Sequence, residues 1–572
     1  MQAFNPSIRR KKIQTIQDLF RNRVSLTPDK IAYQYRTATT KSWNSITWQS
    51  IFQKVLHVRN ALSSEKLNVK DRILIALPNS IEWVIIEQAA HELGLIPVSI
   101  PANSAANTIH HIATETDAKL LFLDNGNIIS SLNSYENFSS HKRKTLCIND
   151  HALLADKHCY KKWLMNNQKH PSSSKHHVKA NSLATIIYTS GTTGKPKGVM
   201  LSHEALLNNA FASIEKIDLN ENDRLLSVTP ISHCMERIAG YYSPMITGAT
   251  VCFPNNSNDI KTTLTEIKPT IMVTTPSLLV RAYDKTTENG ALDNFGNFFG
   301  FINKNRVKKR ITKSYFESLR YIFTGGAKLP DNITSLCKKL SLPVIEGYGL
   351  TEAGGIVSSN LPLQNQHGSI GRAISNAKIH FSNDGEILVS SNSIMLGYWK
   401  NPGLTQKVLR NEILFTNDIG EIREDTLFIH GRKQHKIHLS TGEKLSPLPI
   451  EQRIKQDNLF KYAMIYGESR DKLAVICSLN RNVLKEVLAQ KIVRTSNSNS
   501  HELKAEITRM ISVRLNTIIK QVPNHLPIEV VISTLDSWTE ENGLLNAKGK
   551  INRHDIEQRY MKKIESAYAN AR

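Results

Sequence analysis

The chain has 572 residues, of which 40% are hydrophobic, and it carries a formal net charge of +23 at pH 7. This length exceeds one ordinary hydrophobic core, so we expect a globular protein of at least two domains. The charge would suit a polyanionic partner, but lysine is abundant along the whole chain, and neither zinc-finger spacing nor an aromatic RNA-binding motif accompanies it. We therefore expect no nucleic acid partner.

The six cysteines are scattered and form no CxxC pair, which argues against a disulfide framework and against a zinc site, and favours a reducing compartment. The basic N-terminal stretch MQAFNPSIRRKKIQ is not followed by the apolar region of a secretion signal. No run approaches the roughly 18 apolar residues of a membrane span. The sequence therefore predicts a cytoplasmic protein, with peripheral contact to a membrane left open.

Short apolar runs alternate with helix-like stretches along most of the chain. DRILIALP, PTIMVTTP, LRYIFTGG and LPVIEGYG are typical of buried strands, and their alternation with helices predicts an α/β fold with mainly parallel strands. From about residue 376, short alternating runs separated by DG and NDIG turns predict an antiparallel β region. The mixed tail after residue 434 is large enough for a separate small domain.

The stretch TSGTTGKPKG at 189–198 stands between the strand-like LATIIY and the helix-like HEALLNNAFASIEKI. A loop of this composition presents backbone N–H groups, hydroxyls and ammonium groups to an anion, so phosphate is the expected ligand. Its glycine spacing fits neither Walker A nor G-x-G-x-x-G. A flexible polar linker is the alternative, although a linker has no need of the KPKG sequence that closes the stretch.

Residues 188–198 resemble the phosphate-loop signature of the adenylate-forming superfamily, which includes acyl-CoA synthetases, luciferase-like enzymes and peptide-synthetase adenylation domains. The resemblance implies that the loop binds ATP, that Thr193 and Lys195 assist catalysis, and that Thr189 also contributes to a Mg²⁺ site. The residues implied to bind the nucleotide here are Thr189, Ser190, Gly191, Thr192, Thr193, Gly194 and Lys195.

The stretch PISHCMER at 230–237 resembles the long-chain fatty acyl-CoA synthetase branch of this superfamily, in which His233 would lie near the acyl path. A lone histidine can equally be a packed polar group, so a catalytic role for His233 is one of two alternatives. Residues 295–313 combine aromatic side chains with a dense basic cluster. They suit either a dock on an anionic membrane or a solvated insertion, and both alternatives stay open.

Two motifs resemble the nucleotide-binding core of the family. LRYIFTGGAKL at 319–329 resembles the turn beside the adenine, although a GGA turn alone could be an ordinary tight turn. EGYGLTE at 346–352 offers an aromatic ring for adenine, a hydroxyl for a phosphate oxygen and, in Glu352, a carboxylate for Mg²⁺; a buried tyrosine and a helix cap are the alternative. The resemblance implies nucleotide contacts by Gly325, Gly326, Ala327, Glu346, Gly347, Tyr348, Gly349 and Thr351.

The antiparallel region contains three more family-like stretches. DGEILV at 384–389 and GYWKNP at 397–402 resemble structural motifs, and no chemistry is assigned to them. LFTNDIG at 414–420 resembles the segment whose aspartate, here Asp418, holds the ribose hydroxyls. Asn417 stands where the family has glycine, but asparagine tolerates positive φ better than most residues, so we expect the turn to form.

Two loops mark the predicted domain boundary. GRKQ at 431–434 resembles the hinge of the family, which implies that Arg432 contacts ribose or phosphate. Gln434 replaces the usual charged hinge residue, a change expected to affect the kinetics of the hinge more than the activity. Gly442, in the loop that precedes PLPIE, resembles the glycine-rich loop at the thioester-forming face.

ENGLLNAKGKINR at 541–553 resembles the segment that carries the catalytic lysine of adenylation. One lysine in a chain this basic could be only a solvated surface charge. The glycine-lysine-apolar spacing and the downstream Arg553 favour Lys550 over Lys548 for the catalytic role.

The resemblance implies an α/β fold with a large N-terminal adenylate-forming domain at 1–432, made of two αβ-layered subdomains and a distorted β-barrel, and a small mobile α+β domain at 433–572. The implied reaction activates a long-chain fatty acid with ATP and Mg²⁺ to an acyl-adenylate, then transfers the acyl group to CoA. The alternatives are transfer to a carrier protein, or a catalytically silent protein that keeps the fold. Chain length and oligomeric state stay open.

Overall fold

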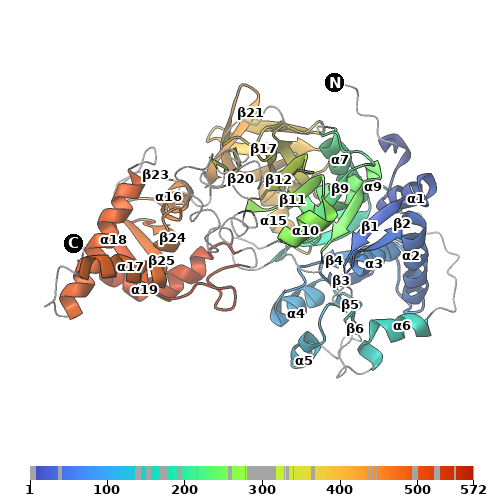
Figure 1. Ribbon diagram of the computed structural model, residues 1–572, viewed down its shortest axis with the longest axis horizontal. Helices are drawn as coiled ribbons and strands as arrows, with labels where there is room; N and C mark the ends of the chain where they lie inside the picture. Colours follow the sequence, from blue (N-terminus) through green and yellow to red (C-terminus); the bar gives the residue numbers. More distant parts are fainter. Residues whose placement is uncertain are drawn as a thin grey trace, which may run out of the picture.

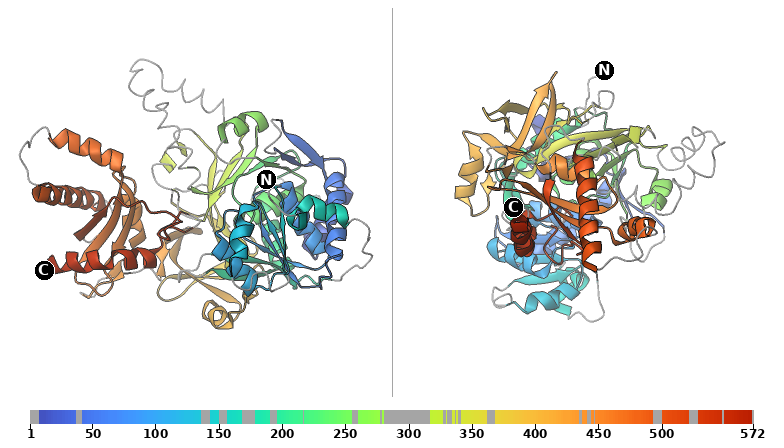
Figure 2. Two further views of the ribbon diagram at one scale, coloured as in Figure 1. Left: turned by 90° about the horizontal axis from the view of Figure 1, so that it is seen from below. Right: turned by 90° about the vertical axis from the view of Figure 1, so that its left-hand side faces the viewer.

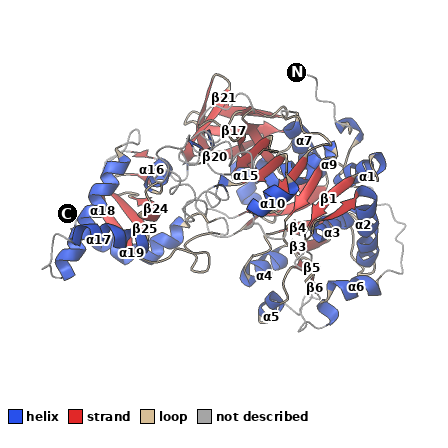
Figure 3. Ribbon diagram, in the orientation of Figure 1, coloured by secondary structure: helices blue, strands red, loops and turns tan. Residues whose placement is uncertain are grey.

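The computed structural model describes residues 8–36, 42–135, 143–149, 156–167, 178–189, 196–215, 217–254, 260–276, 279, 317–326, 329, 334, 335, 337, 338, 341–361, 368–433, 437–440, 444, 445, 447–492, 500–520, 528–546 and 549–570. Two lobes of unequal size are visible in Figures 1 and 2, the smaller formed by the C-terminal elements. Helices flank the strands of both lobes (Figure 3).

The first sheet of the large lobe has seven strands in the order β18-β8-β7-β4-β3-β5-β6. Along β3, Ile73 and Ile75 join a core with α2 (Trp48–Ser63) and α3 (Ile81–Glu92). Leu74 and Ala76 join a second core with α4 (Ala106–Glu115) and α5 (Asn127–Asn133). Successive side chains of a strand point to opposite faces, so helices cover both faces of this sheet. Its strands are β3 (Arg72–Ala76), β4 (Ile96–Ser99), β5 (Leu120–Leu123), β6 (Lys144–Cys147), β7 (Leu183–Thr189), β8 (Lys197–Ser202) and β18 (Gly397–Tyr398).

The second sheet has nine strands in the order β15-β14-β13-β12-β11-β9-β10-β1-β2, and its central strands are parallel. The carboxyl ends of parallel strands meet at one edge of a sheet, where ligands of open α/β sheets bind. Its strands are β1 (Ile31–Tyr35), β2 (Asn44–Thr47), β9 (Arg224–Ser227), β10 (Thr250–Phe253), β11 (Ile271–Thr274), β12 (Tyr321–Gly325), β13 (Val344–Leu350), β14 (Gly355–Ser359) and β15 (Arg372–Ala373).

Helices of the large lobe cover these two sheets and link their strands. They are η1 (Arg10–Lys12), α1 (Ile16–Leu26), α2 (Trp48–Ser63), α3 (Ile81–Glu92), α4 (Ala106–Glu115), α5 (Asn127–Asn133), η3 (Asp156–His158), α6 (Tyr160–Asn166), α7 (His203–Ile214), α8 (Cys234–Glu236), η4 (Arg237–Tyr242), α9 (Ser243–Thr247), α10 (Ile260–Ile267), η6 (Thr351–Ala353) and α15 (Pro402–Val408). In the described part of the chain, no helix combines the length and the apolar character needed to cross a bilayer.

A third sheet confirms the predicted antiparallel β region. It occupies the part of the chain for which the family resemblance implied a distorted β-barrel. Its strands run β16-β17-β20-β19, and β21 pairs with β20. Ile387, Val389 and Leu414 join the main core of the large lobe, so this sheet packs against the second one. The strands are β16 (Ala377–Phe381), β17 (Glu386–Ser391), β19 (Leu409–Arg410), β20 (Ile413–Arg423) and β21 (Thr426–Arg432).

The small lobe has a three-stranded sheet of its own, between two layers of helix. Val475 on β25 packs with α16 and α18, whereas Ile476 packs with α19, and the two cores contain only residues from 437 onward. The predicted mixed α/β tail is therefore a lobe with its own core; the exact boundary at 432/433 stays a prediction. The elements are β22 (Ile437–His438), β23 (Lys444–Leu445), α16 (Pro447–Ile454), β24 (Phe460–Tyr466), β25 (Leu473–Leu479), α17 (Arg481–Ile492), α18 (Ser500–Ile519), β26 (Ile528–Thr534) and α19 (Arg553–Asn570).

A buried ion pair ties helix α3 to the segment that follows His233. Arg237 Nη1 lies 3.7 Å from Glu87 Oε1, and both side chains are 0% exposed. Tyr242 also donates a hydrogen bond to Glu87 Oε1 at 2.9 Å, and Arg237 donates one to Thr185 Oγ1 of β7 at 2.9 Å. Burial acts to raise the pKa of Glu87, but its neighbours, Arg237 among them, hold that pKa below its ordinary value.

We expect Arg237→Met to lower the free energy of unfolding of the large lobe by about 3–5 kcal/mol, because it leaves a buried carboxylate without its cation. Adding Glu87→Gln should recover part of this loss. Lys119→Met, which removes an exposed pair of 2.7 Å with Asp117, is the control and should cost at most about 1 kcal/mol. Urea unfolding followed by tryptophan fluorescence measures all three; equal losses in Arg237→Met and Lys119→Met would contradict the prediction.

Candidate active site

The ends of β12 and β13 bring the two nucleotide motifs together. Gly325 pairs with Gly347 across the two parallel strands. A Cβ on Gly349 would lie 1.8 Å from the Gly355 carbonyl oxygen, so only glycine lets β13 and β14 pair this closely. Gly326 directly follows β12 and has φ +79°, a left-handed conformation that glycine adopts without strain. The structure thus places these predicted glycines at one edge of the nine-stranded sheet.

Asp418 lies between Tyr348 and Arg432, which come from separate motifs. The Tyr348 hydroxyl donates to Asp418 Oδ2 at 2.8 Å, and Arg432 Nε donates to Asp418 Oδ1 at 2.9 Å. Tyr348 and Asp418 are buried. Burial raises the pKa of Asp418, while Arg432, Tyr348 and Lys550 act in the opposite direction. Three residues that the sequence assigned to nucleotide contacts are therefore one hydrogen-bonded cluster.

Asn417 adopts the left-handed backbone that the sequence predicted, with φ +60°. Its N–H group donates to Glu386 Oε1 at 2.9 Å, and Glu386 Oε2 accepts a hydrogen bond from Lys433 at 2.9 Å. Lys433 also lies 2.7 Å from Asp384. The turn before Asp418 is thus held by Glu386, which belongs to the DGEILV stretch. No chemistry was assigned to that stretch from the sequence.

Glu346 and Glu352 face different surroundings although they belong to one motif. Glu346 is buried, and its Oε2 accepts a hydrogen bond from the Leu329 N–H group at 3.2 Å. Glu352 on η6 is half-buried, and its Oε1 accepts a hydrogen bond from the Tyr398 hydroxyl at 2.8 Å. Sequence reasoning missed Tyr398, because GYWKNP was interpreted as purely structural.

The donor set at Glu352 fits Mg²⁺. Its carboxylate offers hard oxygen donors, and Mg²⁺ is commonly held by one or two carboxylates together with phosphate oxygens. Thr189, the other predicted ligand, is half-buried at the end of β7. Among the described residues, no group of three or more His, Cys, Asp or Glu side chains could hold a metal ion.

Lys550 reaches the site from the small lobe. Its Nζ donates a hydrogen bond to the Gly326 carbonyl oxygen at 3.0 Å, across 224 positions of sequence. A tight loop presents it, since the Asn546 N–H group donates to the Lys550 carbonyl oxygen at 2.9 Å and Leu545 bridges to Ile551. The contact joins Lys550, which the sequence favoured as the catalytic lysine, to the glycine turn that was predicted to lie beside the adenine.

His233 lies at the border of the glycine turn. Its half-buried side chain precedes α8, and its N–H group donates to the Pro230 carbonyl oxygen at 2.9 Å. A Cβ on Gly325 would lie 2.9 Å from Met235 Sδ, so the PISHCMER segment packs directly against the end of β12. Several predicted residues lie outside the described ones: Ser190, Gly191, Thr192, Thr193, Gly194, Lys195, Ala327, Gln434, Gly442 and the segment 295–313.

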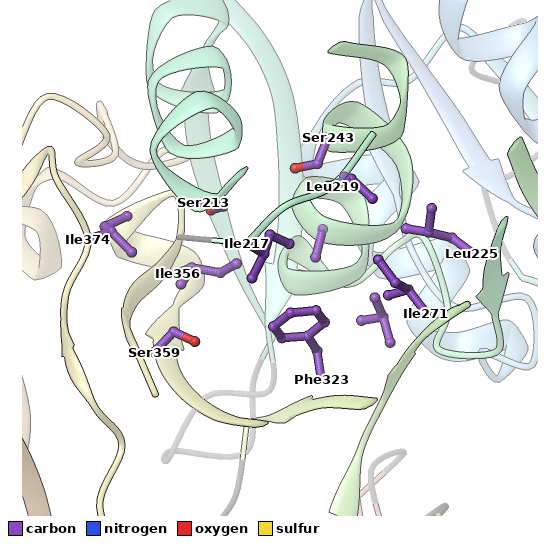
Figure 4. A pocket seen from close by; sticks show the side chains of 12 residues that line it. Ser213, Ile217, Leu219, Leu225, Ser243, Ile271, Phe323, Ile356, Ser359 and Ile374 are labelled. Carbon is purple, nitrogen blue, oxygen red and sulfur yellow. The ribbon is translucent and has the colours of Figure 1, made fainter. Parts of the chain in front are cut away.

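An apolar pocket lies in the large lobe, and Figure 4 shows the side chains that line it. Its walls include Ala239, four residues after Met235, and Phe323, two residues before Gly325. Its volume is about 40 Å³, so it is much smaller than the ~150 Å³ cavity that admits a benzene ring. The lining residues are Ser213, Ile217, Leu219, Leu225, Ala239, Ser243, Ile271, Val273, Phe323, Ile356, Ser359 and Ile374.

Comparison with known proteins finds two family models that together match most of the chain. The family model described as AMP-binding enzyme matches residues 20–399, and the model of the AMP-binding enzyme C-terminal domain matches 434–572. The chain belongs to the AMP-binding enzyme family. The superfamily predicted from the motifs of this AMP-binding enzyme is thereby confirmed.

Relatives cover nearly the whole of this AMP-binding enzyme. The long-chain-fatty-acid–CoA ligase FadD15 of Mycobacterium bovis is 22% identical, over 95% of this chain and 95% of its own. Fatty acyl-CoA synthetase A of Dictyostelium discoideum is 26% identical, over 91% and 86%. A solved O-succinylbenzoate CoA synthetase of Bacillus subtilis, in complex with ATP and magnesium ion, has a TM-score of 0.69 at 18% identity, covering 94% and 98%. This likeness confirms the predicted α/β fold with a large N-terminal and a smaller C-terminal domain.

We expect Asn417→Ala to lower the stability of the large lobe by about 1–2 kcal/mol, because alanine keeps the Cβ that is strained in the left-handed conformation and loses the short polar side chain that stabilises asparagine there by local hydrogen bonding. Asn417→Gly removes the same side chain without that strain, so its loss should be clearly smaller. Urea unfolding of both variants measures the difference. Equal stability of Asn417→Ala and Asn417→Gly would mean that the backbone here carries no such constraint.

Proposed function

We propose that this AMP-binding enzyme is an AMP-forming acid–CoA ligase. It would join a carboxylic acid to ATP as an acyl-adenylate, with release of pyrophosphate, and then transfer the acyl group to the thiol of CoA, with release of AMP. The observation that carries the proposal is the contact of Lys550 Nζ with Gly326, beside the cluster of Tyr348, Asp418 and Arg432.

Each described residue of the site can act on one part of the nucleotide. Asp418 would accept hydrogen bonds from the ribose hydroxyls, with Tyr348 and Arg432 holding its carboxylate in place. Lys550 would offset the negative charge that grows on the phosphates as the acid attacks. Mg²⁺ held by Glu352 and Thr189 would supply further neutralisation of phosphate charge. The phosphate-loop residues predicted at 190–195 would add backbone and hydroxyl donors.

The second half of the reaction requires Lys550 to leave. The lysine belongs to the small lobe, so a turn of that lobe about the predicted hinge at Gln434 would withdraw it and open a path for CoA to the acyl-adenylate. The loop of Gly442 would face CoA after this turn. No protein nucleophile is needed, and all six cysteines lie in the described part of the chain and are buried, without a disulfide.

A long-chain fatty acid is the acid that we propose. The names of the two relatives and the apolar lining of the pocket in the large lobe support this choice. An acyl chain is larger than the pocket, so Phe323 and Ile217 would have to move to admit it. His233 would lie along the entrance, either as a packed polar group or in contact with the carboxylate. A cytoplasmic location and a peripheral membrane contact through residues 295–313 stay predictions.

A screen of pyrophosphate release with carboxylic acids of six to twenty carbons, with and without CoA, tests the proposal. Release that peaks at long chains and yields acyl-CoA would support it. Accumulation of acyl-AMP without acyl-CoA would favour the alternative in which a carrier protein accepts the acyl group. A purified, folded chain that releases no pyrophosphate with any acid would favour a catalytically silent protein that keeps the fold.

Lys550→Ala should slow ATP–pyrophosphate exchange by about 10²–10³-fold, because it removes a charge that stabilises the transition state. Conversion of supplied acyl-adenylate to acyl-CoA should change little, since that step would proceed with the lysine withdrawn. Lys548→Ala is the matched control and should leave exchange near the wild-type rate. If the two alanine variants slowed exchange equally, the assignment of the lysine would be wrong.

A further inference from the structure

The GYWKNP stretch lies against both of the elements that flank the phosphates in the proposed site. Gly397 and Tyr398 form β18, which pairs antiparallel with Met200 and Val199 of β8, the strand that directly follows the phosphate-loop sequence. Just before it, the Met395 N–H group donates to the Glu352 carbonyl oxygen at 2.9 Å. This short segment therefore sets the spacing between the phosphate loop and the turn that carries Glu352.

The backbone around Tyr398 is fixed on three sides. The Tyr398 N–H group donates to Thr405 Oγ1 at 2.9 Å, which ties it to α15. The next residue, Trp399, donates from its N–H group to the Gly198 carbonyl oxygen at 2.7 Å and from Nε1 to the Glu115 carbonyl oxygen at 3.1 Å. These hydrogen bonds hold the backbone in place. If the Tyr398 side chain rotated away from Glu352, a shift of the backbone could therefore not restore the contact.

The side chain of Tyr398 points its hydroxyl at the predicted metal ligand. The residue is only 6% exposed, and Lys197 Nζ lies 5.6 Å from the centre of its ring. Its hydroxyl donates to Glu352 Oε1 at 2.8 Å. Among the described residues, no recorded hydrogen bond or ion pair engages Oε2 of Glu352. One oxygen of the carboxylate is thus held by the protein, and the other is available to a ligand.

We propose that Tyr398 is a positioning residue for the metal carboxylate: its hydroxyl engages Oε1 of Glu352, fixes the plane of the carboxylate and offers Oε2 to the metal–nucleotide complex. The inference rests on the proposed function for the role of Glu352. Groups that orient a metal ligand from behind typically change metal affinity or activity by 10–100-fold when they are removed. Tyr398 is therefore expected to govern metal binding, and not acid binding.

The test measures Mn²⁺ binding by electron paramagnetic resonance, on the full chain with the non-hydrolysable analogue β,γ-imido-ATP. Tyr398→Phe keeps the ring and removes only the hydroxyl, and it should weaken Mn²⁺ binding by about 10–100-fold. Tyr560→Phe is the matched control, because Tyr560 also donates to a carboxylate, Asp536 Oδ2, at 2.8 Å in the small lobe. That control should bind Mn²⁺ as the wild type does.

A second measurement separates positioning from general damage to the site. Affinity for β,γ-imido-ATP in the presence of EDTA should be the same in the wild type and in Tyr398→Phe. Equal losses with and without metal would overturn the proposal, as would wild-type Mn²⁺ affinity in Tyr398→Phe, or a wild-type chain that binds no Mn²⁺–nucleotide. Neither measurement needs turnover of an acid. Absence of pyrophosphate release would therefore contradict the proposed function, whereas the role of Tyr398 is decided by the binding measurements alone.

Discussion

The site depends on one contact between the lobes, the hydrogen bond from Lys550 Nζ to the Gly326 carbonyl oxygen. Each lobe has its own core, so neither needs this contact to fold. This hydrogen bond is exposed, and a typical hydrogen bond contributes only about 0.5–1.5 kcal/mol to stability. An arrangement of this kind can be made and broken during a reaction, which suits a site that two lobes complete together.

Within the large lobe, by contrast, several hydrogen bonds hold the side chains of the predicted nucleotide motifs in place. Tyr348 and Arg432 fix Asp418, Glu386 and Asn417 fix the turn before it, and Tyr398 fixes Glu352. Preorganised groups lose little conformational entropy when a ligand binds, so little of the free energy of their hydrogen bonds to the ligand is offset. Under the proposed function, this hydrogen-bonded half-site in the large lobe would be completed by the charge of Lys550 from the small lobe.

Much of this could be predicted from the sequence, because glycine and charged residues leave local signals. Gly349 marks a close approach of two strands that a Cβ would block, Asn417 marks a left-handed turn that asparagine tolerates better than most residues, and Lys550 follows a recognisable glycine spacing. Partners that meet only through tertiary structure leave no such signal. The hydrogen bond from Tyr398 to Glu352 and the buried pair of Glu87 with Arg237 join positions far apart in sequence, and the pocket is assembled from seven stretches that only the fold brings together.

In the proposed reaction, a carboxylate attacks the α-phosphorus of ATP at this site and splits the nucleotide there. Hexadecanoic acid labelled with ¹⁸O in both carboxyl oxygens tests this most directly, with ATP, Mg²⁺ and CoA and with mass spectrometry of the nucleotide product. The expected product is AMP that carries one ¹⁸O atom from the acid, because the adenylate leaves with a carboxyl oxygen. Unlabelled AMP, or ADP as the product, would contradict the proposed reaction.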